Sequence, residues 1–187
     1  MIAVGVGFAI AFAIAMASLR WPRTYAPATW ATGLLYTIPS LALFALLIPF
    51  TGLTLLTAEI GLVGYTLLIL LRNIVGGIQA VPRDATEAAV GMGYTPAQTL
   101  WRVQLPLALP VIVEGIRVAT ITTIGLVTIT ALIGQGGLGY FILLGIQLFF
   151  STPLLLGAFL SVALAVAADA LVVLVQRALT PWARVRP

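Results

Sequence analysis

Five long apolar stretches constrain the fold of this chain more than any other feature of its sequence. They cover Met1–Leu19 and, approximately, Thr29–Phe50, Leu56–Leu71, Leu109–Ile133 and Pro153–Val175. A helix needs about 20 mostly apolar residues to cross the hydrocarbon core of a bilayer. Only 7% of the 187 residues are charged, whereas a soluble domain carries about a quarter. We therefore predict an all-α membrane protein with about five transmembrane helices, in which residues 1–187 form a single transmembrane domain.

The arginines indicate how these spans are oriented, because cytoplasmic loops of membrane proteins are enriched in basic residues. Except for Arg117, every basic residue follows the first, third or fifth stretch: Arg20, Arg23, Arg72, Arg83, Arg102, Arg177, Arg184 and Arg186. The connections Thr51–Leu55 and Gly134–Thr152 contain no basic residue. This distribution predicts an N-terminus outside, a C-terminus in the cytoplasm and an extracellular segment at about residues 134–152.

The first apolar stretch also has the composition of a signal peptide. A signal peptide carries its positive charge before the apolar region, whereas Arg20 and Arg23 follow Met1–Leu19. We therefore expect a retained span, with a cleaved signal peptide as the alternative.

The sequence lacks the residues that several kinds of catalytic and metal site require. The sequence contains no His and no Cys, which excludes His acid–base catalysis, Cys nucleophiles, disulfides and zinc sites built on these side chains. The arginines are scattered singly, so the net charge of +4 does not indicate a nucleic-acid partner. The phosphate-binding pattern G-x-x-x-x-G-K-[ST] is also missing. We predict no catalytic residue, no metal ligand and no cofactor held by this chain.

The longest polar stretch, a cytoplasmic loop at about residues 77–108, begins with the pattern of a short helix. Asp84 precedes Glu87 by three residues, as in a capping box. Gly91 and Gly93 are suited to end the helix, because glycine adopts the left-handed conformation found at many helix ends.

A second short helix is predicted in the same cytoplasmic loop. Thr95 and Gln98 fit the two positions of a capping box, and Pro96 fits the first helical position. We expect Pro106 and Pro110 to stop this helix and redirect the chain into the fourth span. On this pattern alone, a re-entrant or surface-lying hairpin without a partner is an equally good interpretation.

The cytoplasmic loop resembles the EAA loop of ABC-importer permeases, which has an E-A-A triplet, a glycine a few residues on and a closing Leu-Pro. The matching residues are Glu87-Ala88-Ala89, Gly91, Gly93 and Leu105-Pro106. Further stretches resemble the osmoprotectant branch of these permeases: Thr37–Leu43, Leu71–Asn73, Leu105–Pro110, Gly115–Arg117, Ala131–Gly134 and Gly136–Gly139.

The resemblance implies a permease subunit of an ATP-driven importer in a bacterial or archaeal plasma membrane. Its cargo would be a quaternary-ammonium osmolyte such as glycine betaine, choline or carnitine. The partners would be a cytoplasmic subunit that holds ATP and Mg²⁺, a second permease copy or paralogue, and an extracytoplasmic substrate-binding protein. The residues expected to couple to the ATPase are Asp84, Glu87, Ala88, Ala89, Gly91, Gly93, Leu105 and Pro106. The alternatives are an amino-acid cargo or a self-contained secondary transporter.

Charged residues inside the predicted spans form a second candidate site. Glu114 and Arg117 are three residues apart on one helical face, and Asp169 lies at a similar depth in the fifth span. Charges in a bilayer are paired or face water, so we predict that Arg117 pairs with Asp169 or Glu114, as a structural clamp or as a contact with substrate. Glu59, near the outer end of the third span, has no evident partner and is expected to be an interfacial charge.

Hinge and gate candidates complete the sequence-based predictions. Pro39 removes a backbone hydrogen bond in the second span and kinks or breaks that helix. Gly136, Gly137 and Gly139 lie in an outside turn whose position also suits an extracellular gate. Thr152-Pro153 is expected to cap and begin the fifth span.

Overall fold

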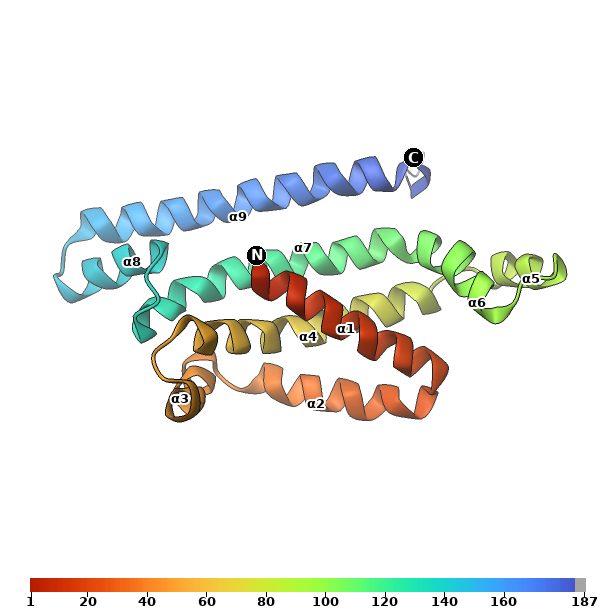
Figure 1. The fold of residues 1–187 in the computed structure, drawn as a ribbon. Coiled ribbons are helices and arrows are strands. Elements are labelled where there is room, and N and C mark those ends of the chain that lie inside the picture. The colour runs from red at the N-terminus through yellow and green to blue at the C-terminus, as the bar shows by residue number, and fades with distance from the viewer. Residues whose placement is uncertain (184–187) are drawn as a thin grey trace.

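The computed structural model describes residues 1–183 and is built from helices and short connections throughout that range (Figure 1). The helices are α1 (Ile2–Arg20), α2 (Tyr25–Thr37), α3 (Ser40–Thr51), α4 (Leu55–Gln79), α5 (Arg83–Gly91), α6 (Pro96–Thr99), α7 (Leu105–Ile129), α8 (Leu138–Gln147) and α9 (Ser151–Leu179). A π-helical turn over Leu100–Gln104 joins α6 to α7. The all-α prediction is confirmed. Arg184 and Arg186, which entered the orientation argument, lie outside the described residues.

Four helical runs are long and apolar enough to cross a membrane: α1, α4, the run Pro96–Ile133, and α9. The predicted second span is instead two helices, α2 and α3, that meet at an angle of 97°. Pro39 breaks the helix because it precedes α3 with its own N–H missing and holds Ile38 in an extended conformation (φ −68°, ψ 127°). Residues 1–183 therefore contain four candidate spans, and a fifth only if the bent α2–α3 pair is one span.

The core lies where α4 packs against α1 and α7. Leu70, Leu71 and Ile74 of α4 are completely buried there. Small residues let the helices approach closely: a Cβ added at Gly115 of α7 would lie 2.5 Å from the Cβ of Asn73. Figure 1 shows α1 crossing over α4, while α9 lies along α7 at the other edge of the bundle.

The cytoplasmic ends of two spans differ from the prediction. The helix α4 continues to Gln79, beyond the predicted end of the span at Leu71. Within this extension the side-chain amide of Asn73 donates to Ile69 O at 2.8 Å and Arg72 is exposed, so the two polar side chains are accommodated in the helix. Pro106 and Pro110 do not stop the second loop helix, because the chain runs helically from Pro96 to Ile133. The π-helical turn before Pro106, in which Leu105 N–H bonds Leu100 O, provides the altered bonding that a proline ring requires.

The segment predicted to be extracellular contains a helix that the sequence analysis did not predict. After the turn at Gly134–Gly137, α8 runs back beside the beginning of α9 and forms a helical hairpin with it (Figure 1). A Cβ added at Gly157 of α9 would lie 2.9 Å from the Cβ of Phe141, so the two helices are in close contact. The helix α9 already begins at Ser151, with Phe150 as its N-cap, so the predicted cap at Thr152 is wrong.

Candidate functional site

The first helix of the cytoplasmic loop starts earlier than its sequence pattern suggests. Pro82 is the N-cap of α5, and no side chain caps the helix. Asp84 lies in the first turn, so the predicted capping box of Asp84 and Glu87 is wrong. A carboxylate in the first turn still stabilises the helix, because it lies near the positive end of the helix dipole.

The predicted coupling residues divide between two faces of α5. Asp84, Glu87, Ala88 and Gly91 are exposed and recur at helical spacing, whereas Ala89 is buried against the rest of the loop. Small and acidic side chains thus form the outward face of this helix.

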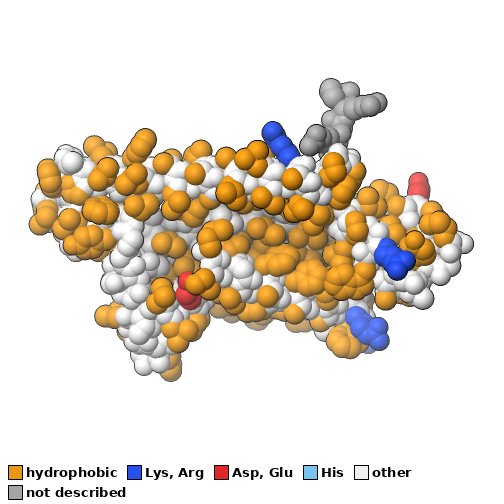
Figure 2. Space-filling model, turned by 45° about the horizontal axis from the view of Figure 1, so that its top comes forward, with side chains coloured by type: hydrophobic (Ala, Val, Ile, Leu, Met, Phe, Trp, Pro, Cys, Tyr) orange, Lys and Arg blue, Asp and Glu red, His pale blue; other side chains and the backbone are white. Residues whose placement is uncertain are grey.

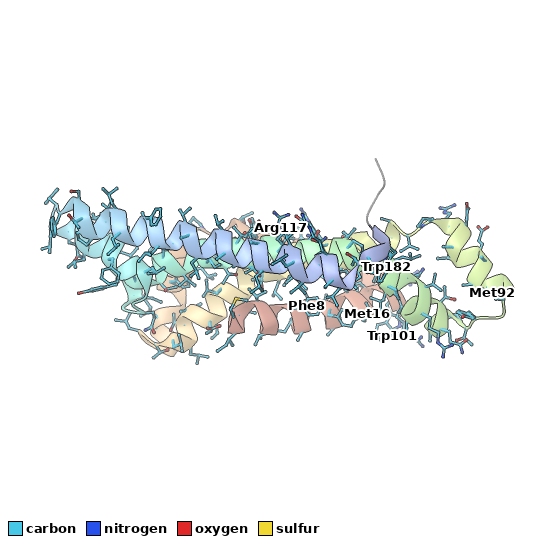
Figure 3. The ribbon with its side chains drawn as sticks, turned by 90° about the horizontal axis from the view of Figure 1, so that it is seen from above. Phe8, Met16, Met92, Trp101, Arg117 and Trp182 are labelled. Atoms are coloured by element: carbon cyan, nitrogen blue, oxygen red, sulfur yellow. The ribbon has the colours of Figure 1, made fainter. Side chains whose placement is uncertain are left out.

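Two apolar side chains extend this outward surface at the tip of the loop. Val90 is 63% exposed and Met92 is 69% exposed. In Figure 3, Met92 lies at the end of the molecule farthest from α8. The acidic outward face of α5 and the exposed apolar side chains beside it form a surface suited to a protein partner.

The turn between the two loop helices is stabilised by a left-handed glycine and by side-chain capping. The helix α5 ends at Gly91, and Gly93 has a left-handed conformation (φ +85°), as predicted. Thr95 N–H then donates to Gln98 Oε1 at 2.8 Å, and Gln98 N–H donates to Thr95 Oγ1 at 3.3 Å. The predicted capping box of the second helix is confirmed, and it orients α5 relative to the chain that enters α7.

Leu105 and Pro106 have a different place from the other predicted coupling residues. They form the first turn of α7, after the π-helical turn, and Leu105 packs against the core at the α1–α4–α7 junction. The helix α5 contacts the π-helical turn itself. The helix α5 is thus in contact with the turn that leads directly into α7.

Both predicted partners of Arg117 contact it. Its Nε and Nη2 atoms donate to the two carboxylate oxygens of Asp169, with Nη2 to Oδ2 at 3.0 Å, and Nη1 donates to Glu114 at 3.3 Å. The bidentate pair links α7 to α9, and the Glu114 contact lies within α7. We call these three residues the ion cluster.

The ion cluster is partly accessible. The exposed fractions of the Arg117 and Asp169 side chains are 33% and 29%, and that of Glu114 is 44%. Arg117 carries one positive charge against two carboxylates, so the ion cluster has a net negative charge when all three groups are ionised.

A second polar contact between α7 and α9 was not predicted. Gln176 Nε2 donates to Pro110 O at 3.1 Å. Gln176 follows Asp169 by two helical turns, and Pro110 precedes Arg117 by two turns on the antiparallel helix. This matched spacing is present in the sequence, but it becomes informative only once the pairing of the two helices is known.

The remaining intramembrane acid lies apart from the ion cluster. Glu59 is in the first part of α4, and its Oε2 atom is buried without a hydrogen-bond partner in residues 1–183. Burial of one carboxylate oxygen does not fit a freely hydrated interfacial charge.

The glycine turn and the helix break at Pro39 are each held by a hydrogen bond to another part of the fold. Gly136 and Gly137 have positive φ angles of 51° and 71°, and a Cβ added at Gly139 would lie 2.1 Å from Thr128 O. Gln135 Nε2 donates to Leu53 O at 3.2 Å, which ties the glycine turn to the α3–α4 connection. On the other side, the hydroxyl of Tyr65 on α4 donates to Ile38 O at the helix break beside Pro39.

Residues 6–181 match the model of one protein family, described as the binding-protein-dependent transport system inner membrane component. The chain is 36% identical to the choline transport system permease protein OpuBB of Bacillus subtilis over 181 residues, which cover 97% of this chain and 83% of the relative. It is 38% identical to the osmoprotectant import permease protein OsmW of Salmonella typhimurium over 190 residues, which cover 97% of this chain and 87% of the relative.

The fold is similar to that of a solved transporter chain. The inward-facing MetNI methionine ABC transporter aligns with a TM-score of 0.82 and 23% identity, covering 96% of this chain and 90% of the other. At this identity the similarity concerns the fold, and it supports the all-α membrane architecture described above.

Proposed function

The chain belongs to the family of inner membrane components of binding-protein-dependent transport systems, as a permease subunit of an ABC importer, and we propose that its cargo is a quaternary-ammonium osmolyte such as glycine betaine, choline or carnitine. One observation carries the choice of cargo: the named relatives transport choline or osmoprotectants, and their similarity extends over 97% of this chain. An amino-acid cargo is the alternative that the transport test below must exclude.

The cytoplasmic loop is the proposed contact with the ATP-binding subunit. The outward face of α5 offers Glu87 to a basic partner, and Ala88 and Gly91 allow a second surface to approach closely. Val90 and Met92 add apolar area that becomes buried on docking. ATP and Mg²⁺ would be bound by that separate subunit.

The proposed path of coupling runs from α5 to the fifth span. Closure of the ATPase dimer would move α5, and the π-helical turn would pass this movement to α7. The Arg117–Asp169 pair would then carry α9 along with α7 as one unit. In this role the ion cluster is a structural clamp, and Arg117 is a positioning residue rather than a contact with cargo.

The outer glycine turn and the helix break are the proposed moving parts. Gly136, Gly137 and Gly139 can change conformation or packing where the turn meets the α3–α4 connection. Pro39 separates α2 from α3, so these two helices can move independently. The remaining partners we propose are a second permease copy or paralogue and an extracytoplasmic substrate-binding protein.

Transport by the reconstituted importer tests the cargo directly. The permease, its ATPase and its binding protein would be placed in vesicles, and uptake of labelled choline, glycine betaine, carnitine and methionine would be compared with and without ATP. We expect ATP-dependent uptake of at least one quaternary-ammonium compound. Uptake of methionine alone would replace the proposed cargo with an amino acid, and uptake without ATP would contradict the ABC-importer role.

A further inference from the structure

A cavity of about 580 Å³ lies at the cytoplasmic root of the loop, between the ends of α1 and α4 and the beginnings of α5 and α6. Its lining has two kinds of side chain. Arg20 and Arg83 contribute positive charge, whereas Met16, Leu19 and Trp101 form an apolar wall. Figure 3 shows the labelled Met16 and Trp101 close together at this end of the bundle. We call this cavity the arginine pocket.

The two arginines of this pocket have no anionic partner among residues 1–183. Neither guanidinium forms an ion pair or a hydrogen bond with another side chain within residues 1–183. Arg20 ends α1 and Arg83 begins α5, so the fold brings two like charges from distant parts of the sequence to one cavity. An anion between them would reduce their repulsion and make charge-assisted hydrogen bonds to both.

The depth of the arginine pocket places it at the membrane boundary. Arg20 is the last residue of the first span, and the following Trp21 is 60% exposed, as expected for a tryptophan at headgroup level. The ring of Trp101 lies 6.2 Å from that of Phe12, inside the span, and Trp101 is still 58% exposed. With Trp21 at headgroup level, the apolar wall would lie in the hydrocarbon region and the arginines at the level of the phosphates.

We propose that the arginine pocket binds the phosphate of an anionic phospholipid, with Arg20 and Arg83 holding the headgroup and an acyl chain lying along Met16, Leu19 and Trp101. Basic pockets between helices on the cytoplasmic side are suited to such lipids. The apolar wall favours a lipid over free phosphate, which would leave that surface uncovered.

The position of the pocket also favours a lipid over the ATP-binding subunit. The outward face of α5 carries Glu87 and Ala88, and the apolar tip carries Met92. The arginine pocket lies at the opposite, membrane-proximal root of the same hairpin. A lipid phosphate bridging α1 and α5 would fix the orientation of the loop and leave its outward face free to dock.

On the face shown in Figure 2, the blue side chains all lie in the half of the molecule that carries the cytoplasmic loop. Other arginines therefore attract anionic lipids nonspecifically, and the test needs a control with the same loss of charge. Arg23 and Arg72 are exposed, lie on the cytoplasmic side and do not line the arginine pocket. A double variant Arg23→Gln/Arg72→Gln removes as much charge as Arg20→Gln/Arg83→Gln.

Native mass spectrometry of the purified permease–ATPase complex, equilibrated with phosphatidylglycerol or phosphatidylcholine, measures lipid retention. We expect selective retention of phosphatidylglycerol by the wild type and by the control. The Arg20→Gln/Arg83→Gln variant should lose this retention about tenfold or more, because each basic residue at the surface contributes to anionic lipid binding. Arg20→Lys/Arg83→Lys keeps the charge and should retain the selectivity, which separates loss of the site from misfolding.

Three results would overturn the proposal. Equal losses in the pocket and control variants would mean nonspecific attraction. Displacement of the bound lipid by inorganic phosphate at equal concentration would mean a free-anion site. Loss of the ATPase subunit from the Arg20→Gln/Arg83→Gln variant, with lipid retention unchanged, would mean that the pocket receives an acidic residue of that subunit. Because lipid retention is measured without cargo, the proposal stands or falls independently of the osmolyte specificity.

Discussion

The spans α4 and α9 are both long and apolar, yet their surroundings differ. In the most apolar 18-residue stretch of α4, half of the residues are buried within the chain. In the corresponding stretch of α9, none is buried. Within α9, Gly157 is the one buried residue of the described range. Apolar content alone therefore does not decide whether a membrane helix lies in the core or at the edge.

The two helices are held by different forces. Lipid is as apolar as leucine, so helices in a bilayer associate through close packing and polar contacts. The helix α4 is held by packing, as at Gly115 of α7 against Asn73. Along the α7 side, α9 is held by the Arg117–Asp169 pair and the Gln176–Pro110 hydrogen bond. We expect substitutions that enlarge a packed residue to weaken the α4–α7 contact. Substitutions that remove a charge or a hydrogen-bond donor should instead weaken the α7–α9 contact.

The largest effect on stability is expected at the α4–α7 contact. In Gly115→Ala the new Cβ would lie 2.5 Å from Asn73 Cβ, so the helices must separate. Overpacking of this kind costs about 1–3 kcal/mol. Thermal unfolding of the purified permease, followed by its helical circular dichroism, measures the loss.

The same helix supplies the control for that substitution. A Cβ at Gly125 of α7 would have no heavy atom within 4 Å apart from its chain neighbours and the adjoining backbone of its own helix. Gly125→Ala should leave stability unchanged or raise it slightly, because alanine favours a helix over glycine. Equal destabilisation by both variants would mean that helix packing at Gly115 is not the cause.

The second effect concerns the ion cluster. Asp169→Asn leaves Arg117 with Glu114 alone and removes the charged link from α7 to α9. We expect a several-fold fall in ATP-dependent uptake with little change in binding of the ATPase subunit. Uptake by reconstituted vesicles and co-purification measure the two quantities separately.

Charge reversal sharpens the test of the clamp. Arg117→Asp/Asp169→Arg keeps one charge of each sign and should recover part of the uptake lost in either single variant. If Asp169→Asn transports as fast as the wild type, the pair does not act as a clamp.

The smallest effect is expected for the second polar contact. Gln176→Leu removes the donor to Pro110 O, and hydrogen bonds between membrane helices contribute about 0.6 kcal/mol on average. The fall in thermal stability should therefore be smaller than for Gly115→Ala. Ser161→Ala is a suitable control, because Ser161 Oγ donates to Gly157 O of its own helix.

The sequence predicted the parts of the molecule that local chemistry determines. The capping box of Thr95 and Gln98, the left-handed Gly93 and the pairing of Arg117 follow from residue spacing and charge. The E-A-A resemblance identified Glu87, Ala88 and Ala89 together, and only the structure shows that Ala89 is buried while the other two are exposed. Four of the spans followed from apolar length.

The errors arise where a neighbouring segment changes the outcome. Pro110 has the pattern of a helix stop, but the helix continues from Pro96 through α7. The break at Pro39 was predicted, but the angle of 97° between α2 and α3 was not, and the Tyr65 hydroxyl of α4 donates to Ile38 O beside the break. The helix α8 is stable beside α9, and no local signal distinguishes it from an extracellular turn. Gln176 gains its role only from the pairing of α7 with α9.

The most direct test of the coupling role is co-purification of the tagged permease with its ATP-binding subunit. Glu87→Arg on the outward face of α5 should lose that subunit, while the matched Gln147→Arg at the end of α8, on the opposite side of the membrane, should retain it as the wild type does. Retention by both variants, with ATP-dependent uptake intact, would contradict the assignment of the α5 face as the docking surface.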